Sequence, residues 1–404
     1  MPSLRFRSRD GRNLTKAARL LGGAIAVAAV AGGCGGSGGG GRSANLHPDL
    51  IVADYNNNRV LAYKQPFSNG EAAHKVLGQT DFTSGLCNQD SSLGATTLCQ
   101  PYSAATDRSG HGWVADSGND RVLEFLPPFS NGMAASVVLG EPDFATDTGC
   151  GETTANGLCL PTSVAFDKHG NAWVADQGNC RVLEFTPPFS NGMAASLVLG
   201  QPDLSTGCST TGGQNGMHSP EFLTFDKSGN LWVSDYYNDR VLEFTPPFSN
   251  AMNAALVLGQ PDFTTYACNA DANGECASEG VAFDSSGNLW LGDDGNCRAL
   301  QYQPPFATNM NASVVLGQAN LTDSCVITSG QAGLADAGGV GFDPTGHFYV
   351  SDFLNNRVMQ FSAPFSNGMN ASKVFGEPDF STTTANTTQD GLHGPWGLSI
   401  GDTP

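Results

Sequence analysis

Two glutamates, Glu221 and Glu279, occupy equivalent positions in neighbouring copies of a segment that this chain repeats, and Asp336 follows in the next copy. Oxygen atoms of carboxylates are preferred ligands of Ca²⁺, so this set could hold a hard cation and support a hydrolase or lyase reaction. The alternative is that both glutamates are solvated rim carboxylates on a very acidic protein. Beyond this Ca²⁺ candidate we expect no cofactor.

Other sets of catalytic residues do not stand out. The chain has no Gly-x-Ser-x-Gly motif and no glycine-rich phosphate loop that follows a strand. His111, His169 and His347 lie in short turns of the repeat, and only His218 and His393 lie in its long variable loops. We therefore assign no catalytic residue and favour a binding protein over an enzyme.

An Asp-x-x-Asn-x-Arg element recurs about every 60 residues, which indicates one supersecondary unit copied in an array. A residue that occurs in every copy is most simply structural, so we expect these side chains to bond neighbouring backbone. The copies are Asp54/Asn57/Arg59, Asp116/Asn119/Arg121, Asp176/Asn179/Arg181, Asp235/Asn238/Arg240, Asp293/Asn296/Arg298 and Asp352/Asn355/Arg357.

The cysteines follow the same register. Apart from Cys34, five cysteines recur at one position after the end of a repeat, and each has one other cysteine in the same loop or in the preceding Asp-x-x-Asn-x-Arg turn. A metal–thiolate site is disfavoured because no Cys-x-x-Cys pair occurs. The predicted disulfides, which require an oxidising compartment, are Cys87–Cys99, Cys150–Cys159, Cys180–Cys208, Cys268–Cys276 and Cys297–Cys325.

Each repeat contains four short apolar runs separated by turn residues. Between residues 161 and 200 the runs are Ser163–Asp167, Ala172–Asp176, Arg181–Phe185 and Ser196–Gly200. Runs of this length with turn signals between them predict antiparallel strands. Six such four-stranded units predict an all-β, six-bladed β-propeller.

The pattern Phe-Asp-x-x-Gly-Asn-x-Trp-Val-x-Asp-x-x-Asn-x-Arg-Val resembles the NHL repeat, over residues 47–404. The resemblance implies six blades around a central channel. The first repeat lacks its innermost strand, and residues 393–401 match that strand, so we expect the C-terminal strand to join blade one and close the ring.

The resemblance also bears on the channel mouth. Some NHL members are amidating lyases that would suggest a three-histidine zinc site there, and other six-bladed propellers are lactonases that hold a central Ca²⁺. None of the equivalent positions is histidine, which argues against the lyase. These positions are Tyr102, Thr162, Glu221, Glu279, Gly338 and Trp396.

The first 33 residues resemble a bacterial export signal, with basic residues before an apolar stretch from Leu20 to Val30. Cys34 follows and would be the lipidated residue of a lipoprotein, with a glycine-rich tether over 34–46. Ordinary cleavage after Ala31 is the alternative. We expect an exported protein of the cell envelope, anchored in the membrane only through this lipid.

The net charge of −19 excludes a basic footprint for nucleic acid. The leading hypothesis is a monomeric binding scaffold that docks a protein, peptide or glycan on its loop-rich face. The predicted ligand-binding residues are Tyr102, Glu221, Glu279 and Trp396, and Glu221 and Glu279 are also the metal candidates. The alternative is a cation-dependent, lactonase-like hydrolase or lyase at the channel mouth.

Overall fold

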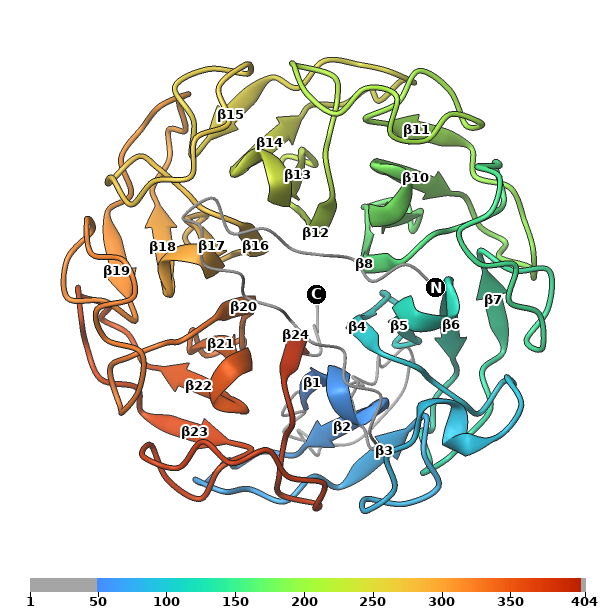
Figure 1. Cartoon of the computed structure of the whole chain (residues 1–404), viewed down its shortest axis with the longest axis horizontal. Coiled ribbons are helices and arrows are strands. Elements are labelled where there is room, and N and C mark those ends of the chain that lie inside the picture. Colours follow the sequence, from blue (N-terminus) through green and yellow to red (C-terminus); the bar gives the residue numbers. More distant parts are fainter. Residues whose placement is uncertain (1–48, 401–404) are drawn as a thin grey trace, which may run out of the picture.

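Residues 49–400, which the computed structural model describes, form six antiparallel sheets of four strands arranged as blades around a central axis (Figure 1). We call the strands of a blade a to d, from the axis outward. The first three blades are β24 (Pro395–Ile400), β1 (Leu50–Asp54), β2 (Arg59–Tyr63) and β3 (Lys75–Leu77); β4 (Pro101–Thr106), β5 (Gly112–Asp116), β6 (Arg121–Phe125) and β7 (Val137–Leu139); and β8 (Pro161–Phe166), β9 (Ala172–Asp176), β10 (Arg181–Phe185) and β11 (Leu197–Leu199).

The other three blades repeat the same order. They are β12 (Pro220–Phe225), β13 (Leu231–Asp235), β14 (Arg240–Phe244) and β15 (Leu256–Leu258); β16 (Ser278–Phe283), β17 (Leu289–Asp293), β18 (Arg298–Tyr302) and β19 (Val314–Leu316); and β20 (Ala337–Phe342), β21 (Phe348–Asp352), β22 (Arg357–Phe361) and β23 (Lys373–Phe375). The predicted all-β, six-bladed propeller is confirmed. The predicted signal over 1–33, the tether over 34–46 and Cys34 lie outside the described residues.

The last strand closes the ring. β24 pairs antiparallel with β1, so that Ile400 lies opposite Leu50 and Leu398 lies opposite Val52. Blade one is thereby built from strands at both ends of the described chain, which keeps the seam of the ring paired. The predicted closure is confirmed.

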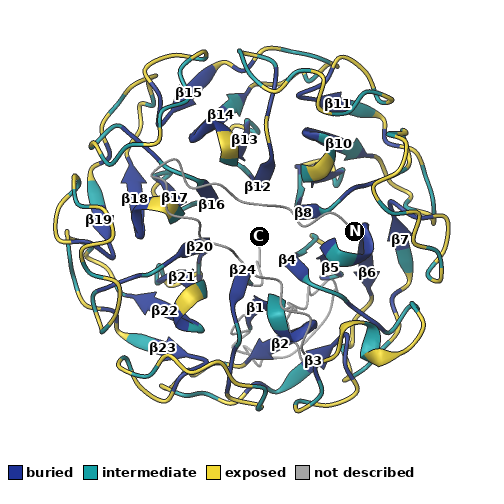
Figure 2. Ribbon diagram, in the orientation of Figure 1, coloured by how far each residue is buried: buried dark blue, intermediate teal, exposed yellow. Residues whose placement is uncertain are grey.

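Aromatic side chains fill the spaces between blades. The tryptophans of strand b are fully buried, and each lies against a phenylalanine in strand a of the next blade: the ring centroids of Trp113 and Phe166 are 5.5 Å apart, and those of Trp173 and Phe225 are 5.9 Å apart. Inclined aromatic pairs of this kind add to the free energy of burying the rings. Figure 2 shows the resulting pattern, in which the strands are buried and the outer loops are exposed.

The Asp-x-x-Asn-x-Arg element builds the turn between strands b and c. In each blade this turn is one short 3₁₀ helix: η1 (Tyr55–Asn57), η3 (Ser117–Asn119), η4 (Gln177–Asn179), η5 (Tyr236–Asn238), η6 (Asp294–Asn296) and η7 (Phe353–Asn355). One further 3₁₀ helix, η2 (Cys87–Asp90), lies in the loop between blades one and two.

The repeated arginines are buried and join the loops on either side of a blade. In blade two the Arg121 Nε donates to Asp116 at 2.8 Å, and its guanidinium also donates to the backbone carbonyls of Phe144 and Thr97, each at 2.8 Å. Asp116 in turn accepts the backbone N–H of Cys99 at 2.7 Å. A buried charge is tolerated only when it is paired and hydrogen-bonded in this way. The predicted structural role of the repeated residues is confirmed.

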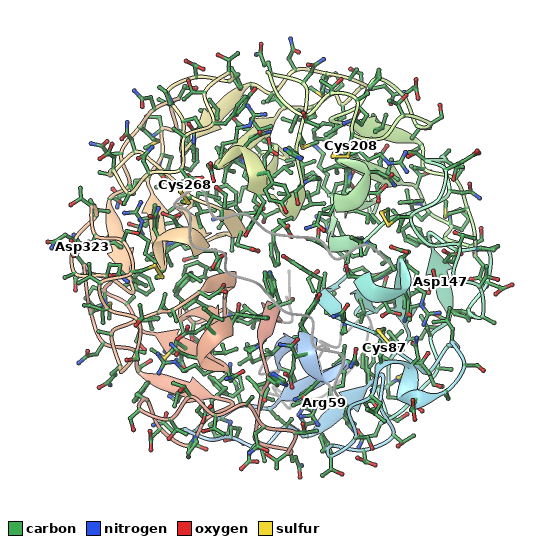
Figure 3. The ribbon with its side chains drawn as sticks, in the orientation of Figure 1. Arg59, Cys87, Asp147, Cys208, Cys268 and Asp323 are labelled. Carbon is green, nitrogen blue, oxygen red and sulfur yellow. A yellow bond between two sulfur atoms is a disulfide. The ribbon has the colours of Figure 1, made fainter. Side chains whose placement is uncertain are left out.

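All five predicted disulfides are present (Figure 3). Two of them replace a hydrogen bond that other blades make. The residue after each 3₁₀ turn is left-handed, and in blades one, two, four and six it is Asn or Asp, whose side chain accepts a backbone N–H from the next loop, as Asp120 does from Leu160 at 2.6 Å. In blades three and five this residue is Cys180 or Cys297, and it bonds covalently to that loop instead.

The disc has two different faces. The b–c turns and the long connections from strand d to the next strand a form the loop-rich face; the connections are 78–100, 140–160, 200–219, 259–277, 317–336 and 376–394. The a–b turns and the c–d hairpins form the opposite face, which we call the turn face. Every disulfide lies in the loop-rich face, because each pairs cysteines of its loops and turns.

Within residues 49–400 no helix has the length and apolar character needed to cross a membrane. The five disulfides are typical of proteins in oxidising compartments, which agrees with an extracellular or exported protein.

Candidate functional site

The loop-rich end of the central axis is closed by side chains from the start of strand a. Tyr102, Glu221, Glu279 and Trp396 are each the second residue of this strand, in blades two, four, five and one. The ladder to strand b is shifted at this position, and such bulges re-aim a side chain. The ring centroid of Tyr102 lies 5.0 Å from that of Trp396 and 5.8 Å from that of Phe222. We call these five residues the axial plug.

The two glutamates of the axial plug accept hydrogen bonds from its neighbours. Glu279 Oε2 accepts the Trp396 indole N–H at 2.9 Å and lies 3.5 Å from the Tyr102 hydroxyl. Glu221 Oε1 accepts from the Gln177 side-chain amide and from the Ser219 hydroxyl. Among the described residues, Glu279 Oε1 has no hydrogen-bond partner.

The electrostatics of the axial plug favour a protonated carboxyl group. Burial raises the pKa of Glu279 well above its usual value, and the negative charge of Glu221 raises it further. Burial followed by the charge of Glu221 also raises the pKa of Tyr55 and of Tyr237 to about 12. Both effects favour the protonated form of the Glu279 side chain.

The expectation that Glu221 and Glu279 are solvated rim carboxylates is wrong. Only 2 % of Glu221 and 0 % of Glu279 is exposed. The reason is that equivalent positions in other blades carry large aromatic side chains, Tyr102 and Trp396, which meet at the axis and cover the carboxyl groups. The structure thus brings together all four predicted binding residues, but inside a packed cluster.

The axial plug is poorly suited to Ca²⁺, because hydrogen-bond donors of the protein already occupy some of its carboxyl oxygens. An indole N–H, an amide and hydroxyl groups point at these oxygens, and a cation would have to displace them. Asp336 is also buried, and its charge contributes to the raised pKa of Glu279. Ca²⁺ needs six to eight oxygen ligands that are free to coordinate it.

One group outside the plug has the composition of a metal site. His111 Nδ1 lies 2.9 Å from Glu124 Oε1 and 3.2 Å from Asp107 Oδ2. In blade three an asparagine makes the same link, since the Asn171 amide donates to both Asp167 and Glu184. A residue that links the a–b turn to strand c in this way explains His111 without a metal.

A cavity of about 670 Å³ lies on the axis and opens at the turn face. All six innermost strands line it, and its wall includes Val164, Leu223, Val281, Val340 and Leu398. We call this cavity the funnel. The predicted binding residues lie at the opposite end of the axis, and the funnel was not predicted.

The residues at the funnel mouth had a detectable signal. The position after the a–b turn aspartate is Arg108, Lys168 and Lys227 in three consecutive blades, although basic residues are scarce in this chain. Basic residues at one position of three consecutive repeats were therefore the signal in the sequence for the mouth of the funnel.

The loop-rich face combines exposed apolar side chains with acidic charge. Of the five exposed large hydrophobic residues in the described part of the chain, four lie in its loops or turns: Leu86, Tyr237, Val326 and Leu354. The His218 ring lies 4.9 Å from that of Tyr237. The six connections from strand d to strand a contain Asp and Glu residues but neither Lys nor Arg.

No family model and no curated protein matches the chain, so its membership of the NHL family stays a prediction. Solved structures do resemble it. A chain of a nidogen/laminin complex aligns with a TM-score of 0.53 at 15% identity, over 87% of this chain and 98% of that chain. A catalytically inactive virginiamycin B lyase from Staphylococcus aureus, solved with quinupristin, aligns with a TM-score of 0.44 at 10% identity, over 79% of this chain and 82% of that chain.

A candidate 6-phosphogluconolactonase from Bacteroides uniformis aligns with a TM-score of 0.46 at 12% identity, over 88% of this chain and 99% of that chain. At these identities a likeness concerns the fold alone. A shared fold does not decide between a binding protein and an enzyme.

Proposed function

We propose that this protein is an exported binding scaffold whose loop-rich face docks a protein partner with a basic surface. The observation that supports this proposal is that four exposed apolar side chains lie on that face. They are Leu86, Tyr237, Val326 and Leu354. Protein-binding surfaces combine apolar side chains with polar residues.

The charge of the loop-rich face indicates which kind of partner it would attract. The six long connections carry only acidic charged residues, so a basic partner is attracted and an acidic one is repelled. The five disulfides constrain five of these six connections, which reduces the ordering cost of binding. An N-terminal lipid on Cys34 would keep the scaffold at the membrane surface.

A pair of variants with matched exposure tests the proposal. Tyr237 on the loop-rich face is 41 % exposed, and Leu126 on the turn face is 42 % exposed. Envelope proteins that are captured by the wild-type protein, and identified by mass spectrometry, should be lost with Tyr237→Ser plus Leu354→Ser and retained with Leu126→Ser. Capture should weaken as salt is raised. Loss with Leu126→Ser alone would contradict the proposal.

The second candidate is a cation-dependent hydrolase or lyase that uses Glu221 and Glu279. The observation in its favour is that two carboxyl groups meet near the axis, with Glu279 Oε1 lacking a hydrogen-bond partner among the described residues. Metal analysis of the purified protein separates the two candidates. A stoichiometric divalent cation that is lost with Glu279→Gln would favour the enzyme, and a metal-free protein would favour the scaffold.

A further inference from the structure

The free basic residues of this acidic protein gather at the mouth of the funnel. Residues 49–400 contain twelve lysines and arginines, and six are the buried arginines of the repeated turn. Three of the remaining six, Arg108, Lys168 and Lys227, line the funnel and are exposed. They come from consecutive blades, so they form an arc over one half of the mouth. Blades five and six have Ser285 and Pro344 at the same position.

Four aspartates, Asp107, Asp226, Asp284 and Asp343, also line the funnel, and within the described residues none of them forms a salt bridge with the arc. Each aspartate of an a–b turn is held by its own turn: Asp107 Oδ1 accepts the N–H groups of Ser109 and His111 at 2.8 and 3.0 Å. Asp226 Oδ1 likewise accepts those of Ser228 and Asn230 at 2.8 and 2.9 Å. These carboxylates are thereby bound to donors within their own blades.

The three cations keep their charge available. The Arg108 guanidinium donates to the backbone carbonyl of Lys168 at 2.8 Å, and the Lys227 ammonium donates to that of Ser285. Within the described part of the chain, none of the three forms a salt bridge. Carbonyl oxygens position these groups and leave further N–H donors for an anion.

Below the arc the wall combines apolar side chains with small hydroxyl-bearing residues such as Ser103 and Ser163. Ala104, Val164, Leu223, Val281 and Val340 line the funnel, and Phe222 of the axial plug lies at its inner end. A volume of about 670 Å³ is in the range of small-molecule sites, which combine apolar walls with a few placed polar groups. Burial of an apolar chain against this wall would be favourable.

We propose that the funnel binds a small amphipathic anion, whose apolar body lies along the innermost strands and whose anionic group meets Arg108, Lys168 and Lys227. The site is separate from the loop-rich face and does not depend on the function proposed for that face. The ligand class is an aliphatic or aromatic carboxylate or sulfonate.

Titration calorimetry with dodecanoate, kept below its micellar concentration, tests this site. The variant Arg108→Gln/Lys168→Gln/Lys227→Gln should bind dodecanoate at least about tenfold more weakly than the wild type, because charge-assisted hydrogen bonds are lost. The matched control Lys64→Gln/Lys75→Gln/Lys373→Gln changes the net charge equally at residues that do not line the funnel. It should bind nearly as the wild type does.

Two ligand series test the two halves of the proposed ligand. Affinity should rise from octanoate to dodecanoate because more apolar surface is buried, and dodecyltrimethylammonium should bind more weakly than dodecanoate. No binding of dodecanoate to the wild type, equal weakening in the two triple variants, or tighter binding of the cationic detergent would each overturn the proposal. Partner capture by the loop-rich face should be the same in all three proteins.

Discussion

The same six strands end in a closed plug on one face of the ring and in an open funnel on the other. At the loop-rich end, strand a begins with large or ionisable side chains such as Tyr102, Glu279 and Trp396, which pack across the axis. A few residues later the same strands carry small or aliphatic residues such as Ala104 and Val281, which line the funnel. In this ring the side chains at symmetry-related positions of strand a therefore decide which end of the channel is open.

The two faces also differ in how they are stabilised and charged. The loop-rich face carries all five disulfides, and its long connections have no Lys or Arg. The hairpins of the turn face are nearly identical in sequence, as Pro127–Ser136 and Pro187–Ser196 show, yet this face carries the basic arc of Arg108, Lys168 and Lys227. The turn face therefore repeats one backbone geometry, although the charged side chains around the mouth of the funnel are distributed asymmetrically.

We expect the largest effect on stability from removing β24, which contributes side chains to both the axial plug and the funnel. Deleting residues 393–404 removes Trp396 from the axial plug and Leu398 and Ile400 from the funnel, and it leaves β1 unpaired on one side. Unpaired edges template association, so we expect aggregation or a loss of cooperative unfolding in calorimetry. Deleting only residues 401–404 keeps β24 and should leave unfolding unchanged. A ring that melts normally without β24 would show that closure occurs differently.

Single substitutions should show that the axial plug and the funnel wall contribute differently to the free energy of unfolding. Trp396→Ala should lower the free energy of unfolding by about 3–5 kcal/mol, because it leaves a void in a packed cluster and removes the donor to Glu279. Leu398→Ala should cost about 2 kcal/mol, since that side chain lines an existing cavity. Urea denaturation measures both. Equal costs would mean that the plug is no better packed than the funnel wall.

The disulfides of the loop-rich face should contribute next. Replacing Cys180 and Cys208 by Ala and Ser should cost about 3–4 kcal/mol in the loop-entropy model, given their separation of 28 residues. Replacing Cys180 by Asn with the same Cys208→Ser should recover about 1 kcal/mol, because Asn58 and Asn356 hydrogen-bond the next loop from this position. Thermal melts of both variants give the comparison. A variant with Asn that is no more stable than the one with Ala would show that the two devices are not equivalent.

The pH dependence of stability should have opposite signs at the two faces. Burial and the charge of Glu221 raise the pKa of Glu279, so the folded state holds a proton that the unfolded state releases above about pH 4.5. The contribution of Glu279 to the free energy of unfolding therefore falls as pH rises, by at most about 1.4 kcal/mol per pH unit. Glu279→Gln should therefore flatten the decline in the free energy of unfolding above that pH.

The matching carboxyl group at the turn face is Asp343. Burial acts to raise its pKa, but hydrogen bonds from Thr345 and His347 outweigh burial and hold the pKa below its usual value. The contribution of Asp343 to the free energy of unfolding is therefore present above about pH 3.8. It is lost as pH falls through the lowered pKa. Asp343→Asn should reduce acid sensitivity below pH 4, measured by urea denaturation. Parallel pH profiles for this variant and Glu279→Gln would contradict the assignment.

The repeat register carried most of what could be predicted from the sequence. The spacing of the Asp-x-x-Asn-x-Arg elements predicted six blades, and the same register paired Cys180 with Cys208 and Cys297 with Cys325 correctly. Such inferences succeed because equivalent residues of a repeat occupy equivalent places. The strand bounds were right to within a few residues for the same reason.

Contacts across the axis could not be predicted in this way. The repeat register gives the blade and the position of a residue, but it does not say how six different side chains share one narrow space. Tyr102 of blade two approaches Glu279 of blade five, and that contact buries a carboxyl group expected at a solvated rim. The openness of the funnel likewise depends on the summed volumes of residues from six strands.

The interchange of a hydrogen bond and a disulfide after the 3₁₀ turns suggests a way to engineer the ring. Cys180 and Cys297 sit in the same left-handed conformation as Asn356, with φ near 55°, and both bond to a residue 28 positions later. From Asn356 that position is Thr384, in the one long connection without cysteine, and the Asn356 amide already reaches the neighbouring Thr383 carbonyl at 3.0 Å. A cross-link between positions 356 and 384 would tie blade six to the connection that leads into the closing strand β24, with a device that the protein already uses twice.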